Sequence, residues 1–269
     1  MVTRKVVSQG PRRYGSPPFR TVLVHGGPGA PGTLRPVAQE LGVTLGVVEP
    51  WQTARTVAGQ VEELSDQIDA WASPPVTLVG HSWGAWLALL LAGQHPEIVR
   101  RVVLVGSGPF QERYAAEIRR RRKERLTRGQ WQEFEEIQRR LSGRASRTPA
   151  DALRRLGELA DVADSYALLP RPPTEIAVDP TTFRTVWAEA DEMRRSGALV
   201  RALRQVRAPV VILHGTADPH PLQGVVEPLR RTGVEPRVVV LERCGHDPWR
   251  ERYARDQFFT ELRKELSRA

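Results

Sequence analysis

Short runs of apolar residues recur along the chain, separated by segments whose apolar positions follow the spacing of a helix. Continuous apolar runs are typical of strands that are buried on both faces, as in a parallel sheet. They predict strands over Thr21–Val24, Thr44–Val48, Val76–Val79, Val102–Val105, Val210–Leu213 and Val238–Leu241. The intervening segments predict helices over Leu34–Leu41, Val57–Trp71, Ala85–His95, Val225–Thr232 and Arg250–Leu266. We therefore expect an α/β fold with a mostly parallel central sheet and helices on both faces.

The pattern changes between Pro109 and Val206, where strand-like runs stop and charged residues become more frequent. Helical spacing there predicts helices over Tyr114–Arg128, Gln130–Leu141, Pro149–Ala160 and Pro180–Gln205. The proline-rich stretch Leu168–Thr174 reads as a linker between them. We therefore expect an α/β core made of residues 1–108 and 206–269, interrupted by a helical segment of residues 109–205.

One predicted strand leads directly into a Gly-x-Ser-x-Gly motif. Val76–Val79 is followed by Gly80-His81-Ser82-Trp83-Gly84 and then by an apolar helical segment. Strand, sharp turn and helix in this order are the context of a nucleophile elbow. Glycines on both sides of the serine have no Cβ, so they let the strand and the helix approach closely. We predict that Ser82 is a nucleophile at the positive end of a helix dipole.

Two later strands are each followed by a residue that a serine nucleophile requires. Asp218 follows Val210–Leu213, and His246 follows Val238–Leu241 behind a glycine. We predict that His246 is the general base and that Asp218 orients it. The chain order Ser, Asp, His is that of α/β-hydrolases and differs from the orders of chymotrypsin and subtilisin.

Two other acids are alternatives to Asp218. Asp247 adjoins the histidine in sequence, which makes the required side-chain geometry awkward. Glu49 follows an earlier predicted strand. The remaining histidines carry no such signal: His25 and His214 end predicted strands and are expected to bond loop backbone, and His220 stands between two prolines.

Together with the turn His25-Gly26-Gly27-Pro28-Gly29, these motifs resemble the α/β-hydrolase superfamily. The resemblance covers roughly residues 20–108 and 206–265, and it is greatest to the branch of proline iminopeptidases and carboxylesterases. That branch follows the next strand with an Asp-x-Arg-Gly-x-Gly-x-Ser segment, which the stretch 46–56 does not contain. Peptidase specificity is therefore left open.

The resemblance implies further site features. Backbone N–H groups of Gly27 and Trp83 are expected to form the oxyanion hole, and residues 109–205 are expected to form a cap over the site. In the iminopeptidase branch, acidic cap residues bind the free amine of the substrate. Glu189, Asp191 and Glu192 are candidates for that role here, and a solvated acidic helix face is the alternative.

Composition narrows the function classes. The formal net charge is +9, mostly from arginine, but no helix-turn-helix, zinc or RNA-binding motif accompanies it, so we expect no nucleic-acid partner. Apolar runs are too short to span a bilayer, and the N-terminus lacks the apolar core of a signal peptide, so we expect a cytoplasmic protein. The single cysteine excludes an internal disulfide. No metal-ligand spacing is present, and we expect no metal and no cofactor.

The sequence thus predicts a serine hydrolase that cleaves a carboxylic ester of a small or medium acyl substrate through an acyl-enzyme. An iminopeptidase-like aminopeptidase acting on an amide is the first alternative. A carbon–carbon bond hydrolase and a perhydrolase would use the same three side chains. A hydrolase-fold binding protein with negligible turnover is an alternative from a different class.

Overall fold

A computed structural model describes residues 10–142, 150–170 and 179–268 of the chain. Its central sheet has seven strands in the order β1-β3-β2-β4-β5-β6-β7. All neighbours are parallel except β1 and β3, so the predicted α/β fold with a mostly parallel sheet is confirmed. The strands are β1 (Arg12–Tyr14), β2 (Phe19–Val24), β3 (Gly46–Glu49), β4 (Val76–His81), β5 (Val99–Val105), β6 (Val210–Gly215) and β7 (Arg237–Leu241).

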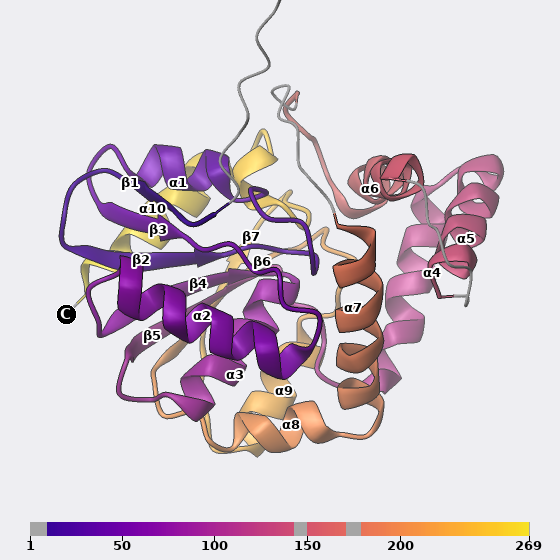
Figure 1. Cartoon of the computed structure of the whole chain (residues 1–269). Helices are drawn as coiled ribbons and strands as arrows, with labels where there is room; N and C mark the ends of the chain where they lie inside the picture. The colour runs from indigo at the N-terminus through magenta and orange to yellow at the C-terminus, as the bar shows by residue number, and fades with distance from the viewer. Residues whose placement is uncertain (1–9, 143–149, 171–178, 269) are drawn as a thin grey trace, which may run out of the picture.

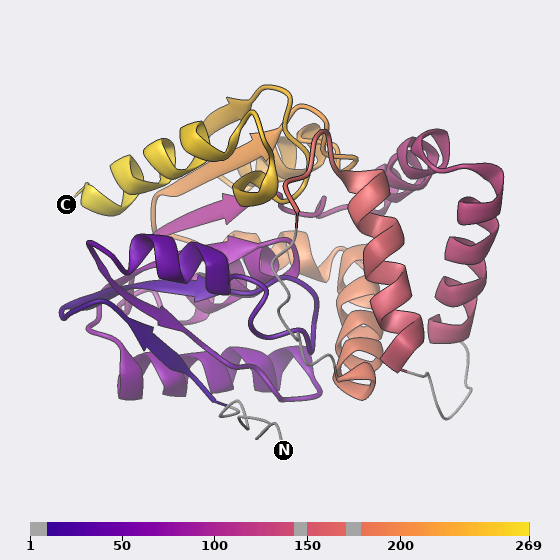
Figure 2. The same ribbon diagram turned by 90° about the horizontal axis from the view of Figure 1, so that it is seen from above.

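Helices cover both faces of this sheet (Figures 1 and 2). Side chains that alternate along the strands enter two separate apolar clusters, as the period of a strand requires. One cluster joins the sheet to α1 (Arg35–Leu41) and α10 (Arg255–Ser267). The other joins it to α2 (Val57–Trp71), α3 (Trp83–Gln94) and α9 (Gln223–Arg231). Both faces are therefore buried at the central strands, where β4 and β6 have no exposed residue.

Residues 109–205, which we call the insertion, leave the core between β5 and β6. Figure 1 shows α4, α5 and α6 standing beside the core, with α7 between them and the sheet. Leu126, Trp131, Phe134 and Leu159 belong to an apolar cluster of the insertion's own. The helices are η1 (Glu112–Tyr114), α4 (Ala115–Arg125), α5 (Arg128–Ser142), α6 (Ala150–Asp164), α7 (Pro180–Arg195) and α8 (Ala198–Leu203).

The structure corrects two of the predicted helices and adds one strand. The single helix expected over Pro180–Gln205 is two helices, because Gly197 takes a left-handed conformation with φ +73° that ends one and begins the next. The helix expected from Arg250 begins at Arg255, after a short 3₁₀ turn η2 (Pro248–Arg250). Strand β1 has no counterpart among the predicted strands. The linker predicted over 168–174 extends beyond the described residues.

Candidate active site

Ser82 lies on the turn between β4 and α3, as the motif predicts. Its backbone has φ 52° and ψ −113°, a strained conformation for a residue with a side chain. A Cβ added at Gly80 would collide with the carbonyl oxygen of Gly84, and one added at Gly84 would collide with that of Val24. The two glycines therefore permit a turn this tight, and it holds Ser82 at the carboxyl edge of the sheet.

The loops after β6 and β7 bring Asp218 and His246 together. Nδ1 of His246 lies 2.9 Å from Oδ2 of Asp218, whose side chain is fully buried. Burial favours uncharged Asp218, but the nearby His246, His220 and His214 outweigh it and hold the pKa of this carboxyl well below its usual range. An ionised carboxylate only accepts hydrogen bonds, so His246 donates from Nδ1 and its Nε2 is left to accept a proton.

The carboxylate of Asp218 also controls the protonation of His246. Burial of the imidazole lowers its pKa, but the opposite charge and hydrogen bond of Asp218 prevail and raise the pKa to about 9. Among the described residues, the Ser82 hydroxyl has no hydrogen bond to His246. Contacts of this kind are often long before a substrate binds.

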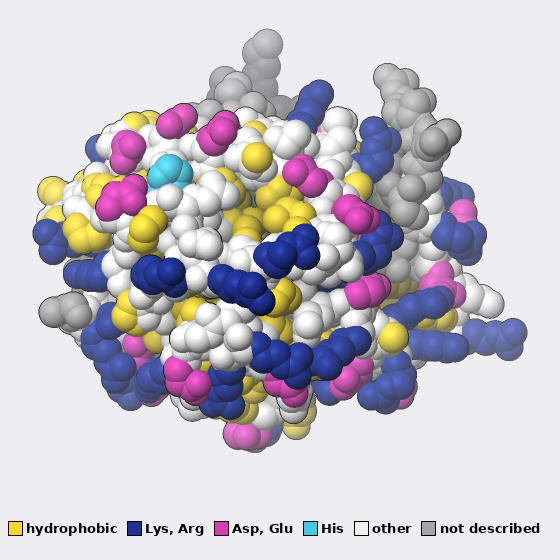
Figure 3. Space-filling view, turned by 90° about the horizontal axis from the view of Figure 1, so that it is seen from below, with side chains coloured by type: hydrophobic (Ala, Val, Ile, Leu, Met, Phe, Trp, Pro, Cys, Tyr) yellow, Lys and Arg dark blue, Asp and Glu magenta, His cyan; other side chains and the backbone are white. Residues whose placement is uncertain are grey.

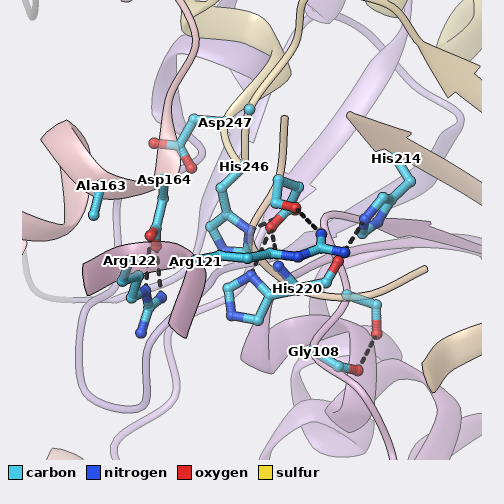
Figure 4. A network of polar contacts seen from close by, with 12 residues as sticks. Gly108, Arg121, Arg122, Ala163, Asp164, His214, His220, His246 and Asp247 are labelled. Carbon is cyan, nitrogen blue, oxygen red and sulfur yellow. Dashed lines mark hydrogen bonds and ion pairs between the residues drawn. The ribbon is translucent and has the colours of Figure 1, made fainter. Parts of the chain in front are cut away.

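A second histidine binds the same carboxylate. Oδ1 of Asp218 accepts hydrogen bonds from the backbone N–H of His220 at 2.9 Å and from its ring Nδ1 at 2.6 Å. Figure 4 shows the rings of His220 and His246 next to each other, and their centroids are 4.4 Å apart. The sequence did not single out His220. The signal that was available is its spacing, since a residue two positions after an aspartate can bond that side chain in a local turn.

The two alternative acids are engaged elsewhere. Oδ1 of Asp247 lies 3.2 Å from Nε2 of His81, and its Oδ2 accepts from Arg250 at 3.0 Å. Glu49 is buried between strands, where the Tyr14 hydroxyl donates to it at 2.7 Å. Neither carboxylate is hydrogen bonded to the His246 ring among the described contacts. The expected backbone contacts of two other histidines are present, from His25 to Gly26 and from His214 to His220.

The glycine-rich turn after β2 faces the serine. A Cβ at Gly26 would contact both the Ser82 side chain and the His81 ring, and Gly27 takes a left-handed φ of +65°. Trp83 is the first residue of α3, a position whose N–H has no partner within the helix. Its indole does not face the pocket described next, because it is buried and donates to Gln60 at 3.1 Å.

A pocket of about 310 Å³ opens beside the serine. Its walls come from the glycine-rich turn, from α1, from the insertion and from the loop between β7 and α10 that carries His246, which we call the histidine loop. They include Gly26, Gly27, Pro36, His81, Ser82, Leu169, Pro170, Asp247, Trp249, Arg250 and Arg255. Leu169 and Pro170 belong to the segment that follows α6, so the insertion supplies one wall of the same cavity that Ser82 lines.

Glu251 joins that segment to the histidine loop. Its fully buried carboxylate accepts from the backbone N–H groups of Tyr166 at 2.8 Å, Ala167 at 2.7 Å and Gly245 at 2.9 Å. The N–H of His246 in turn donates to the carbonyl oxygen of Asp164 at 2.8 Å. The exit of α6 is therefore fixed to the residues on either side of the candidate base.

Ion pairs reinforce this junction. Arg122 of α4 binds both carboxylate oxygens of Asp164, at 2.7 and 2.6 Å (Figure 4). Arg250 binds both oxygens of Asp161 at 2.9 Å while also holding Asp247. The pairs Arg122–Asp164 and Arg250–Asp161 have no signal in the sequence, because their partners are 42 and 89 residues apart along the chain.

The acidic residues considered for amine binding have partners within the protein. Glu189 accepts the backbone N–H of Val57 at 2.7 Å, at the first residue of α2. Asp191 binds Arg194, and Glu192 binds Arg195 at 2.8 Å. Glu189 therefore joins α7 to α2, whereas Asp191 and Glu192 pair with arginines within α7, and none of the three points to a site for a substrate ammonium.

Among the residues that the structure describes, two groups of side chains have the proximity that a metal requires. They are His81, His246 and Asp247, and Asp218, His220 and His246, each with ligand atoms within 4.8 Å of one another. Within each group, histidine nitrogens already contact a carboxylate oxygen.

On the surface, Figure 3 shows basic and acidic side chains interspersed around a hydrophobic area, without one continuous basic face in that view.

A profile of the alpha/beta hydrolase family matches residues 21–259. The chain belongs to this family. A 2-(acetamidomethylene)succinate hydrolase of Mesorhizobium japonicum is 26% identical over 175 residues, which make up 64% of this chain and 58% of that relative. The match thus spans less than two thirds of the relative's length.

Solved structures share the fold. VinJ has a TM-score of 0.69 at 19% identity, covering 95% of this chain and 93% of that one. A proline iminopeptidase of Mycobacterium smegmatis has a TM-score of 0.60 at 18% identity, with the same coverage of 95% and 93%. These structures support the fold, and the family profile over residues 21–259 confirms the predicted resemblance to the superfamily. No described helix combines the length and apolar character needed to cross a membrane.

Proposed function

We propose that the protein is a serine hydrolase that cleaves a carboxylic ester of a small or medium acyl substrate. The observation that carries the proposal is the hydrogen bond of the His246 ring to the buried carboxylate of Asp218, beside a strained Ser82. This bond holds Nδ1 of the imidazole and leaves Nε2 as the acceptor that a general base needs.

In the proposed reaction, Nε2 of His246 takes the proton of Ser82 as Oγ attacks the carbonyl carbon of the ester. The N–H groups of Gly27 and Trp83 stabilise the oxyanion of the tetrahedral intermediate. His246 then gives its proton to the departing alcohol. Water hydrolyses the acyl-enzyme by the same steps, with His246 again acting first as base and then as acid. Every proton transfer in this scheme uses side chains of the chain itself.

The pocket supports a small acyl group. Its volume of about 310 Å³ is at the lower end of ligand pockets, and Pro36, Leu169, Pro170 and Trp249 give it apolar walls. Because Leu169 and Pro170 come from the insertion, we assign residues 109–205 the role of a cap that shapes specificity. Replacing the cap is expected to change acyl preference more than it changes the chemical step.

An aminopeptidase is the less supported alternative, since Glu189, Asp191 and Glu192 already bind groups of the protein. The relative from Mesorhizobium is named for a substrate that contains an acetamido group, but the match covers only 58% of its length. This partial match does not carry a preference for an amide over an ester.

The test uses a fluorophosphonate probe on the protein and on its Ser82→Ala variant, followed by p-nitrophenyl esters and aminoacyl p-nitroanilides. We expect labelling and ester turnover in the native protein, and a loss of labelling with about 10⁴-fold or more lower kcat in the variant. Turnover of anilides alone would favour the aminopeptidase. Failure of the native protein to react with the probe would favour a binding protein.

A further inference from the structure

His220 holds the oxygen of Asp218 that His246 does not use. Two donors of the same residue, the backbone N–H at 2.9 Å and the ring Nδ1 at 2.6 Å, converge on Oδ1. The opposite oxygen, Oδ2, is 2.9 Å from His246. A carboxylate held only by one histidine can turn about its last side-chain bond. The two donors from His220 oppose that rotation.

The loop that carries His220 is itself fixed. The carbonyl oxygen of His220 accepts a hydrogen bond from Nε2 of His214 at 2.9 Å, and that histidine is the penultimate residue of the buried strand β6. Arg121 of the insertion donates to the carbonyl oxygen of Asp218 at 3.2 Å (Figure 4). The backbone of His220 is therefore held from strand β6 on one side, and the backbone of Asp218, whose carboxylate His220 binds, is held from α4 on the other.

His220 is suited to be a neutral donor. Burial disfavours its charged form and lowers its pKa to about 4, despite the nearby carboxylate. At neutral pH it contributes a hydrogen bond without a second positive charge that would compete with His246. The other ionisable groups around the carboxylate are His214, Arg121, Arg122, Asp164 and Asp247.

We propose that His220 is a positioning residue of the candidate triad: its ring N–H holds Oδ1 of Asp218 so that Oδ2 stays directed at His246. The effect of His220 on turnover rests on the proposed function. His220 acts through Asp218 and is assigned no contact with the substrate.

Two substitutions distinguish the effect of the Nδ1–H donor of His220 from the effect of its ring. His220→Asn places an amide nitrogen on Cγ, where the imidazole has Nδ1, and so retains a donor without the ring. His220→Phe retains a ring of similar size without a donor. His95→Phe, at the end of α3, is the control for changing a histidine that lies outside the site. Circular dichroism of all three variants checks that each is folded.

The readouts are ester hydrolysis and the proton NMR signal of the Nδ1–H of His246. We expect His220→Phe to lower kcat about tenfold or more while KM stays within about twofold, as for other residues that orient a functional group. The downfield signal of the His246 proton should broaden or move upfield. His220→Asn should retain most of the kcat and most of the His246 proton signal. His95→Phe should change neither quantity.

Equal losses in the Phe and Asn variants would assign the effect to ring packing and overturn the proposal. An unchanged kcat and an unchanged proton signal in His220→Phe would overturn it as well. If the native protein proves to have no hydrolase activity, the proposed function fails by itself. The proton signal then decides on His220 without any measurement of turnover.

Discussion

The surroundings of Ser82 and the insertion are held together in different ways. Helix α3, which begins directly after Ser82, is buried at every position from Trp83 to Ala92. In α4 of the insertion, only Ile118 is buried, and the remaining positions include five arginines. Packing against the sheet thus leaves the core around the nucleophile few alternative arrangements, whereas ion pairs and a small apolar cluster hold the insertion.

The two regions meet at the histidine loop. Glu251 and the N–H of His246 bind the segment that leaves α6, and Leu169 and Pro170 of that segment line the pocket. A change in the insertion can therefore alter both the pocket beside Ser82 and the position of His246. Under the proposed function, the chemical step depends on residues of the core, and specificity depends on how the insertion is attached to it.

The largest expected effect is at the acid of the core. Asp218→Asn should lower kcat about 10²- to 10⁴-fold, because a neutral amide does not stabilise the charged His246 and can favour the wrong tautomer. Asp247→Asn is the matched control, since Asp247 contacts His81 and Arg250. Steady-state kinetics on a p-nitrophenyl ester make the comparison. A larger loss in Asp247→Asn would move the acid to that position.

The next expected effect is on the pH dependence of the reaction. His246 must be neutral to accept the proton of Ser82, and its pKa is raised to about 9. Below this pKa the neutral fraction falls about tenfold per pH unit, so kcat/KM should rise with pH and level off above about 9. A profile that levels off below pH 7 would contradict the charge stabilisation by Asp218.

A smaller effect is expected where the two regions join. Glu251→Gln replaces one acceptor oxygen by an NH₂ group, although three backbone N–H groups donate to this side chain. A buried N–H is then left without an acceptor, which costs about 1–3 kcal/mol of stability. We expect that loss of stability in urea unfolding, together with about tenfold lower kcat. Glu242→Gln, at a neighbouring exposed position, should change neither value. Full stability in Glu251→Gln would mean that this junction is weaker than its contacts indicate.

The smallest effect is expected on the surface of the insertion. Arg154 and Glu158 form an exposed pair one helical turn apart. Arg154→Ala should change the free energy of unfolding by less than about 0.5 kcal/mol and leave kcat unchanged, since such pairs are screened by solvent. A loss above about 1 kcal/mol would show that the ion pairs of the insertion act as a connected network.

Sequence patterns predicted the features that depend on local geometry. The helix over Val57–Trp71 has the predicted bounds, and most strands begin or end within two or three residues of their predicted positions. Gly80 and Gly84 permit the close approach that a turn at Ser82 requires, so the residues of the motif are enough to predict the turn. Even the break at Gly197 has a local signal, because a glycine within a long helical pattern can end it.

The contacts that orient the candidate base depend on tertiary structure. Asp218 and His246 are on different loops, and only the parallel order of β6 and β7 brings them to the same edge of the sheet. Glu251 binds residues more than eighty positions earlier, and no periodic pattern records such a pairing. The sequence by itself therefore determined the fold class, the strained turn and the types of residue at the site. The sequence favoured Asp218 as the partner of His246 but left Asp247 and Glu49 open. Only the tertiary structure decided which carboxylate faces His246, because hydrogen-bond distance between separate loops is set by packing and not by spacing along the chain.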